Sequence, residues 1–145
     1  DLYGADLCGA DLCGADLYGA DLRDADLRGV RYNEQTAYYA MQCPEKGAYI
    51  GYKKAEGKIV ELEIQENAKR SSATTRKCRA SKAKVLSITS IDGKEHFEEA
   101  KSSRDQSFVY RVGETIEVKD FDENRWSECS TGIHHFITRE EAVFY

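Results

Sequence analysis

The first 33 residues repeat one pattern of apolar and polar positions every five residues. Leucine recurs at positions 2, 7, 12, 17, 22 and 27, and alanine recurs at positions 5, 10, 15, 20 and 25. A period of five changes face at each repeat in a strand and rotates a helical side chain by about 140° per repeat, so neither element buries every leucine. A coil that turns a corner every five residues does, because each leucine then points to the coil axis and each alanine lies at a tight corner.

After residue 33 the pattern changes to short strands separated by turns. Val60, Leu62 and Ile64 alternate with polar residues, which predicts a half-buried strand over 58–65 that pairs with 49–54 in a hairpin. Thr138 and Glu141 have the T-x-x-E spacing of a capping box, which predicts a short helix over 139–144. Further strands are expected at 83–91, 108–112, 115–118 and 133–137, with a turn at Asp92-Gly93 after the first and a hairpin turn at Gly113-Glu114 joining the second to the third.

Residues 67–82 match neither period and are rich in small hydroxyl side chains, so the sequence predicts a long loop there. The expected fold class is mainly β. We expect two domains, a coil of repeats over 1–33 and a β-rich α+β head with a short C-terminal helix over 34–145.

Composition narrows the class of protein. The chain of 145 residues contains 41% hydrophobic and 10% aromatic residues with one proline, which is typical of a folded protein. No apolar run reaches the roughly 18 residues of a membrane helix, and no charged-then-apolar leader opens the sequence. The five cysteines form an odd set without a CxxC pair, which favours free thiols. We therefore expect a cytoplasmic protein without a membrane partner.

The net charge of −5 conceals one basic segment. Between residues 67 and 91 there are seven cations and no carboxylate, and small hydroxyls lie among them. Guanidinium forks, ammonium groups and hydroxyls together are suited to binding phosphate. The sequence therefore predicts a non-catalytic binding module for a phosphate-bearing ligand, a nucleotide or an acidic partner protein. The candidate ligand-binding residues are Lys69, Arg70, Ser71, Ser72, Thr74, Thr75, Arg76, Lys77, Arg79, Lys82 and Lys84.

Two features of this basic segment limit the prediction. It contains no aromatic residue on which a base could stack, which favours a small phosphate ligand over sequence-specific nucleic-acid binding. The same cations could instead pair with acidic residues of the repeats or of 120–123, in which case they would be structural.

An enzymatic alternative centres on Cys129, with His134 as the base of a hydrolase or transferase. Strand alternation would send His134 and His135 to opposite faces, so only one of them could meet the thiol. We expect His135 to be a hydrogen-bonded core residue and His134 to be the more exposed of the two. Because no third orienting residue and no oxyanion signature are visible, the non-catalytic hypothesis is preferred and the enzymatic one stays open.

Metal sites are not favoured by the spacing of potential ligands. Cys43, Cys78, Cys129 and His134 could form a Cys3His zinc site, but structural zinc ligands usually come in close pairs. The acidic residues at 120, 122, 123 and 128 lack the spacing of a calcium loop and are interpreted as a solvated turn. We expect no metal and no cofactor.

The N-terminal pattern resembles that of the pentapeptide-repeat family, A(D/N)LXX, with four repeats per square coil. This resemblance implies a right-handed quadrilateral β-helix in which Leu2 stacks on Leu22, Leu7 on Leu27 and Leu12 on Tyr32. The repeated aspartates are interpreted as a solvated outer face. Some members of the family mimic duplex DNA and bind type II topoisomerases, but their coils are several times longer, so mimicry is not favoured here.

Six repeats form about one and a half coils, which cannot cover both of their own ends. We therefore expect either a fragment of a longer repeat protein or an open end near Asp1 that a second copy covers in a homo-oligomer.

The remainder of the chain resembles a C-terminal domain that follows pentapeptide repeats in bacterial and phage proteins and whose function is unknown. The resemblance implies no activity. It rests on four segments: CPEKGAYIGYKKA (43–55), KRSSATTRKCRASKAKV (69–85), FVYRVGETIEV (108–118) and DFDENRWSECSTGIHHFITREEAVFY (120–145).

Overall fold

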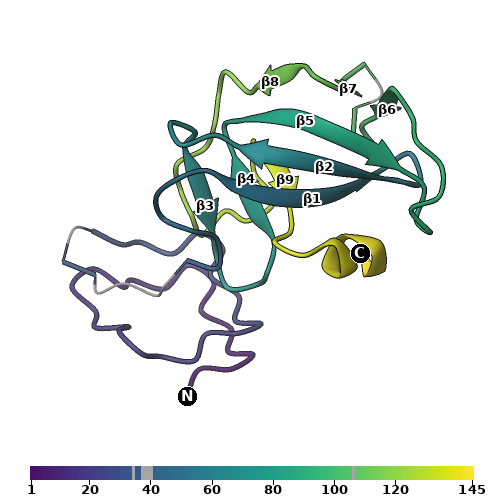
Figure 1. The fold of residues 1–145 in the computed structure, drawn as a ribbon. Coiled ribbons are helices and arrows are strands. Elements are labelled where there is room, and N and C mark those ends of the chain that lie inside the picture. Colours follow the sequence, from purple (N-terminus) through teal and green to yellow (C-terminus); the bar gives the residue numbers. More distant parts are fainter. Residues whose placement is uncertain (34, 37–40, 106) are drawn as a thin grey trace.

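The computed structural model describes residues 1–33, 35–36, 41–105 and 107–145 of the chain. Among these residues the protein is mainly β, with a coil of N-terminal repeats beside a head of short strands and one short helix (Figure 1). In chain order the elements of the head are β1 (Tyr49–Ala55), β2 (Lys58–Ile64), β3 (Arg70–Ser72), β4 (Cys78–Ala80), β5 (Lys82–Thr89), β6 (Glu99–Lys101), β7 (Val109–Arg111), β8 (Thr115–Glu117), β9 (Ile133–His135) and α1 (Arg139–Phe144).

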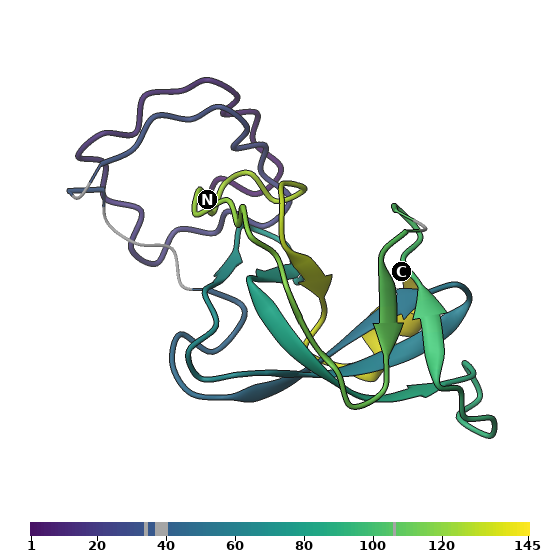
Figure 2. The same ribbon diagram turned by 90° about the horizontal axis from the view of Figure 1, so that it is seen from above.

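Stacked turns of the coil are joined by parallel backbone contacts. Asp6 bridges to Asp26 and Asp11 bridges to Arg31, so residues that stack on one another are 20 positions apart. This offset equals four pentapeptides. The inward leucines become more buried along the coil, and Leu22 has no exposed surface. Seen from above, the coil is a ring (Figure 2).

The corners of the coil depend on two residues of each pentapeptide. A backbone turn closes each corner, as where the amide of Ala5 donates to the carbonyl of Leu2 at 3.0 Å. The third residue of these turns has a positive φ and is usually glycine, although Asp24 takes that place with φ 58°. An aspartate Oδ1 also accepts the amide two residues further on, at Tyr3, Cys8, Cys13, Tyr18, Arg23 and Arg28. The repeated aspartates therefore hold the corners as well as facing solvent.

The largest sheet of the head is antiparallel, with the strand order β1-β2-β5-β8. The predicted hairpin of β1 and β2 is present and turns at Glu56 and Gly57, whose φ angles of 52° and 69° are typical of a tight hairpin turn. Leu62 and the other apolar residues that alternate along β2 are buried. Gly51 and Lys53 of β1 are opposite Leu62 and Val60, so they share this inward face.

The predicted hairpin of 108–112 with 115–118 is wrong in its pairing. Strands form in both segments, but β7 pairs with β6 and β8 pairs with β5. The amide of Gly113 donates to the carbonyl of Val85, and the amide of Val85 donates to the carbonyl of Glu114. Because β5 holds the turn in this way, the turn leads the chain from one sheet to another.

The predicted long loop over 67–82 is also wrong, because it contains β3 and β4. These strands form a second antiparallel sheet with the order β3-β4-β9. Five of their six residues are buried, so both faces are covered. Strands buried on both faces show no alternation of apolar and polar residues, which is why neither was visible in the sequence.

Apolar side chains from all three sheets meet in one core. Leu62 and Val85 come from the four-stranded sheet, Ile133 from β9 and Tyr110 from the two-stranded sheet of β6 and β7. The predicted capping box is present beside this core, since the hydroxyl of Thr138 accepts the amide of Glu141 at the start of α1. The sheets and α1 thereby fix the positions of the loops between them.

The chain between β8 and β9 covers one end of the coil. Trp126 is 6% exposed and belongs to the same apolar cluster as Leu17, Leu22 and Leu27, together with Ala73 from the head. In Figure 2 this yellow-green part of the chain overlaps the side of the ring that faces the head. Ends of solenoids require covering because their last repeat has no neighbour. The coil and the head therefore share one continuous apolar contact.

Candidate anion-binding cleft

A cleft of about 910 Å³ is lined by residues from all three sheets and by Tyr145 at the C-terminus. Small-molecule sites generally have volumes of about 300–1,000 Å³. Cations outnumber carboxylates along its walls. The charged lining residues are Lys53, Lys54, Lys77, Arg104, Lys119, Asp105, Glu117 and Asp120.

Lys53 enters the cleft from the inward face of β1. Its Nζ donates a hydrogen bond of 2.7 Å to Oη of Tyr110 and lies 4.8 Å from the centroid of that ring. Burial, followed by the charges of Arg104 and Lys77, lowers the pKa of Lys53 to about 8. Lys77 and Arg104 therefore lie close enough to Lys53 to oppose its protonation.

Neutral groups hold the other two cations. Nζ of Lys77 donates to Oη of Tyr145 at 3.1 Å and lies 3.8 Å from Sγ of Cys129, while Nη1 of Arg104 donates to the carbonyl of Cys129 at 3.3 Å. Within the described part of the chain, no ion pair joins Lys53, Lys77 or Arg104 to a carboxylate. Their positive field is thus directed into the cleft without direct neutralisation.

Cys129 and His134 both line this cleft, but they do not form a pair. Nε2 of His134 donates to the carbonyl of Ser130 at 2.8 Å, and no hydrogen bond between His134 and Cys129 is found among the described residues. His134 is half-buried and is more exposed than the completely buried His135, as expected. Burial, with repulsion from Lys77 and the other cleft cations, lowers the pKa of His134 to about 4. His134 is therefore neutral and a weak base near pH 7.

Two arginines of the predicted basic site are structural. Arg79 is 2% exposed and donates to the carbonyls of Asp122, Asn124 and Thr131, which shapes the segment before β9. Arg70 donates to several backbone carbonyls, including that of Gln65 at 2.8 Å. Backbone carbonyls accept the hydrogen bonds of both guanidinium groups.

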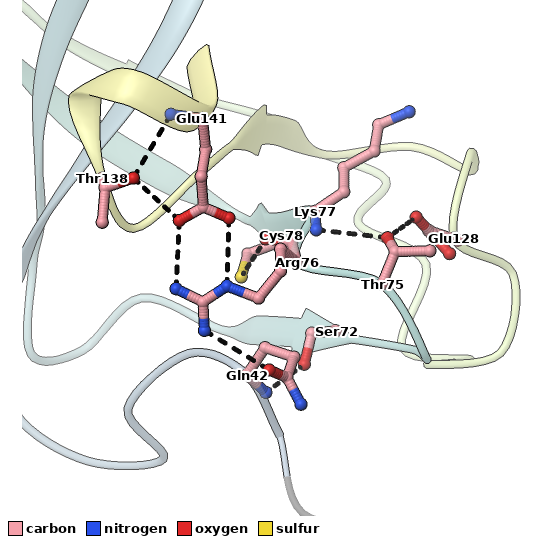
Figure 3. A network of polar contacts seen from close by, with 9 residues as sticks. All are labelled: Gln42, Ser72, Thr75, Arg76, Lys77, Cys78, Glu128, Thr138 and Glu141. Carbon is pink, nitrogen blue, oxygen red and sulfur yellow. Dashed lines mark hydrogen bonds and ion pairs between the residues drawn. The ribbon is translucent and has the colours of Figure 1, made fainter. Parts of the chain in front are cut away.

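Arg76 belongs to the network that joins α1 to β4 (Figure 3). Its Nε and Nη2 each lie 3.0 Å from a carboxylate oxygen of Glu141, which also accepts from the hydroxyl of Thr138. The side chain of Lys77 extends away from this network (Figure 3). A carboxylate of the same chain thus neutralises Arg76.

The remaining predicted residues are distributed over other surfaces. Nζ of Lys69 lies 3.4 Å from Oε1 of Glu123. Lys82 and Lys84 belong to β5. Ser71, Ser72 and Thr74 are buried, the hydroxyl of Thr74 donates to the carbonyl of Ala25, and the hydroxyl of Thr75 donates to Glu128. Of the eleven predicted ligand-binding residues, Lys77 alone is among the described residues that line the cleft.

Sequence reasoning missed Lys53 and Arg104. The inward position of Lys53 could have been predicted from the sequence. Alternate residues of a strand face the same side, so Lys53 lies on the same face of β1 as Gly51 and Ala55. Arg104 lies between β6 and β7, where the sequence pattern predicted no strand before 108. Its position depends on the unexpected pairing of these strands.

His135 is completely buried, as predicted, and its hydrogen bonds explain why. Its Nε2 lies 2.7 Å from Oη of Tyr49, and its Nδ1 lies 2.9 Å from the carbonyl of Ile133. Burial lowers the pKa of His135 to about 4. Cys43 and Cys78 are buried nearby, and their shared hydrogen bond lowers the pKa of Cys43 and raises that of Cys78.

The zinc alternative finds no support in the arrangement of its four residues. Cys43 and Cys78 are buried, whereas Cys129 and His134 lie along the cleft. Across the described residues, no three histidine, cysteine or acidic side chains are grouped as metal ligands.

No described helix is long and apolar enough to cross a membrane.

A repeat coil joined to a β-rich head that carries a cationic cleft defines a two-part class of protein. Residues 1–31 match the family model for pentapeptide repeats (8 copies), and residues 39–142 match that of a family of unknown function, DUF5758. The chain belongs to the DUF5758 family and carries pentapeptide repeats before that domain. No curated protein and no solved structure matches it.

Proposed function

We propose that the head is a non-catalytic binding module and that its cleft receives a small anionic ligand, most simply one that bears phosphate. The observation that carries this proposal is the group of Lys53, Lys77 and Arg104, whose hydrogen-bond partners are hydroxyl, thiol and carbonyl groups. Lys53 and Lys77 are half-buried and Arg104 is exposed. A half-buried cation without a carboxylate partner gains more from an anion than an exposed one.

Aromatic side chains favour a ligand with an apolar part beside its charge. Phe108, Tyr110, Phe136 and Tyr145 line the same cleft. Such rings provide faces on which a flat ring of a ligand can stack. A mononucleotide combines both features, and this supports the nucleotide class that the sequence suggested, at a different site.

In the same proposal, the coil is a right-handed quadrilateral β-helix that sets the position or assembly of the head. The 20-residue offset between Asp6 and Asp26 supports four pentapeptides per turn. The domain boundary falls after residue 33, and the protein acts inside the cell. The coil contributes rigidity, whereas the ligand is bound by the head.

Pyrophosphate and mononucleotides are suitable first probes for this function. A ligand present at about 100 times its dissociation constant stabilises the folded state by about 2.7 kcal/mol, so a thermal-shift titration detects it. We expect a shift in the wild-type protein that is lost in the double variant Lys77→Ala plus Arg104→Ala. Lys84→Ala removes an exposed cation outside the cleft and should retain the shift.

Different results would separate this proposal from its alternatives. If Lys84→Ala lost the shift and the double variant kept it, the ligand would belong to the basic segment instead. No shift with any probe would remove the support for an anion site. Hydrolysis of an ester panel that Cys129→Ser abolishes would favour the cysteine-dependent enzyme.

A second candidate function is structural. Trp126 and Ala73 of the head pack on the apolar end of the coil, so the domain can serve as the cap of a repeat array. This role is compatible with ligand binding. Loss of coil structure after a change confined to Trp126, with the head still folded, would support it.

A further inference from the structure

Lys53 is half-buried, and within the described part of the chain no ion pair joins it to a carboxylate. It shares the inward face of β1 with Gly51 and with Ala55, which has no exposed surface. Its hydrogen-bond acceptor is the hydroxyl of Tyr110, a residue that is 2% exposed. An inward lysine on an edge strand also discourages edge-to-edge association, but that role requires no reactivity.

The groups around Lys53 favour its neutral amine. Lys77, Arg104 and His134 face the cleft from three other segments, while its carboxylates are those of Asp105, Glu117 and Asp120. Burial, followed by the charges of Arg104 and Lys77, lowers the pKa of Lys53 to about 8. At about pH 7.5 roughly a quarter of such amines are neutral, compared with about 0.1% for an ordinary lysine. A neutral amine is the nucleophilic form.

We propose that Lys53 forms an imine with a small anionic aldehyde or ketone held in the cleft. This inference rests on the proposed function, because Lys77 and Arg104 would bind the anionic group and place the carbonyl carbon beside Nζ. It adds a reversible covalent step to the binding site and narrows the ligand class to carbonyl compounds that carry phosphate or carboxylate.

The reaction needs no further co-reactant. The lone pair of Nζ forms a bond to the carbonyl carbon, the carbonyl π pair moves to oxygen, and one proton passes from nitrogen to that oxygen. The resulting carbinolamine loses its hydroxyl group with a second proton as water, which leaves the C=N bond. Oη of Tyr110, 2.7 Å from Nζ, is placed to pass the first proton between the two atoms. Hydrolysis reverses both steps and restores the amine.

Pyridoxal 5′-phosphate tests the inference, because it joins an aldehyde to a phosphate. The full chain is incubated with this probe, reduced with borohydride to convert the imine into a stable secondary amine, and mapped by peptide mass spectrometry. We expect labelling at Lys53 on the order of tenfold faster than with pyridoxal, which lacks the phosphate. Excess pyrophosphate should suppress it. Lys53→Arg should remove this label, and the matched variant Lys84→Arg should retain it.

The result that overturns the inference is labelling of Lys53 no faster than that of Lys84, or equal labelling with both probes. Labelling concentrated on Lys77 would also overturn the assignment. Calorimetry of the wild-type protein with pyrophosphate separates this failure from that of the proposed function. Pyrophosphate binding without an adduct leaves an anion site that forms no imine, whereas absence of both contradicts the two proposals together.

Discussion

The indole of Trp126 meets the ring of Tyr32 edge-on, with 6.5 Å between ring centroids. Tyr32 belongs to the last residues of the coil and Trp126 to the segment before β9, so this contact joins the two parts of the protein. Trp126 also belongs to the apolar cluster that contains Leu22 and Leu27 of the coil. The apolar end of the repeats is therefore buried by the head rather than by a further repeat.

Trp126→Ala should destabilise the protein by about 3–5 kcal/mol, as expected for removal of a large buried aromatic side chain. The coil would lose its cover, and its backbone contacts would open before those of the head. Urea unfolding measures the free energy of unfolding, and amide hydrogen exchange locates the opening. Phe144→Ala provides the control, because Phe144 is 88% exposed and its removal should have little effect. Equal losses in the two variants would contradict this role.

The corners of the coil offer a test of the repeated aspartates. Oδ1 of Asp26 accepts the amide of Arg28 at 3.1 Å, and the hydrogen bonds from Arg28 lower the pKa of Asp26 to about 2. Asp26→Asn retains the acceptor and loses only an exposed ion pair, which contributes little. Asp26→Ala removes the acceptor. We expect faster exchange of the Arg28 amide and a lower melting temperature in Asp26→Ala than in Asp26→Asn, and equal behaviour would show that the carboxamide oxygen has no structural role.

Gly132 is required by close packing rather than by its backbone angle alone. A Cβ atom there would lie 3.0 Å from Cβ of Arg79 and 3.2 Å from the ring of Phe121. Gly132→Ala should therefore cost about 1–3 kcal/mol through overpacking beside the buried guanidinium. Gly47→Ala is the matched control, since Gly47 also has a positive φ but has no atom within 4 Å of the added Cβ. Urea midpoints that fall equally in both variants would leave the backbone angle as the whole cause.

The sequence predicted those parts of the fold that have a visible period. The five-residue period of leucine and alanine predicted the coil. The two-residue period of Val60, Leu62 and Ile64, which are all buried, predicted the hairpin of β1 and β2. The sequence could not reveal β3 or β4, because three-residue strands that are buried on both faces show no alternation of apolar and polar residues. Pairing was equally hidden, since a turn at Gly113 is compatible with a hairpin and with a change of sheet.

The candidate site was harder to predict, because charge in a sequence does not show what surrounds it. Arg79 and Arg76 look alike in the sequence, yet Arg79 donates to backbone carbonyls and Arg76 pairs with the carboxylate of Glu141. Lys53 belongs to an ordinary amphipathic strand, and its character comes from Tyr110, 57 residues away in the chain. Tertiary contacts between distant segments decide which cations stay without a carboxylate partner.

Acid should destabilise the protein before its carboxylates are protonated. Burial lowers the pKa of His135 to about 4 from an ordinary 6.5, so between these values the unfolded chain binds a proton that the folded chain does not. Stability is therefore lost as pH falls from about 6.5 to 4, and His135 alone accounts for about 2 kcal/mol between pH 7 and pH 5. Urea unfolding at the two pH values measures the loss. His134→Gln should reduce it, because His134 titrates in the same sense, and an unchanged stability at pH 5 would contradict the prediction.

Anion binding should weaken as pH rises through about 8, the pKa to which burial and neighbouring cations lower Lys53. The charged ammonium attracts the ligand, whereas the neutral amine does not, so affinity is greatest below this value and declines above it. Sulfate is the suitable probe, because its own charge does not change over this range. Lys53→Met keeps an apolar stem of similar length and removes the titrating group. Calorimetry from about pH 7 to 9 should show a decline in wild-type affinity of at most tenfold per pH unit and a flatter profile in the variant. The other charged groups of the cleft are common to both proteins, so the difference between the profiles belongs to Lys53. Equal slopes would mean that its ammonium does not contribute to the bound state.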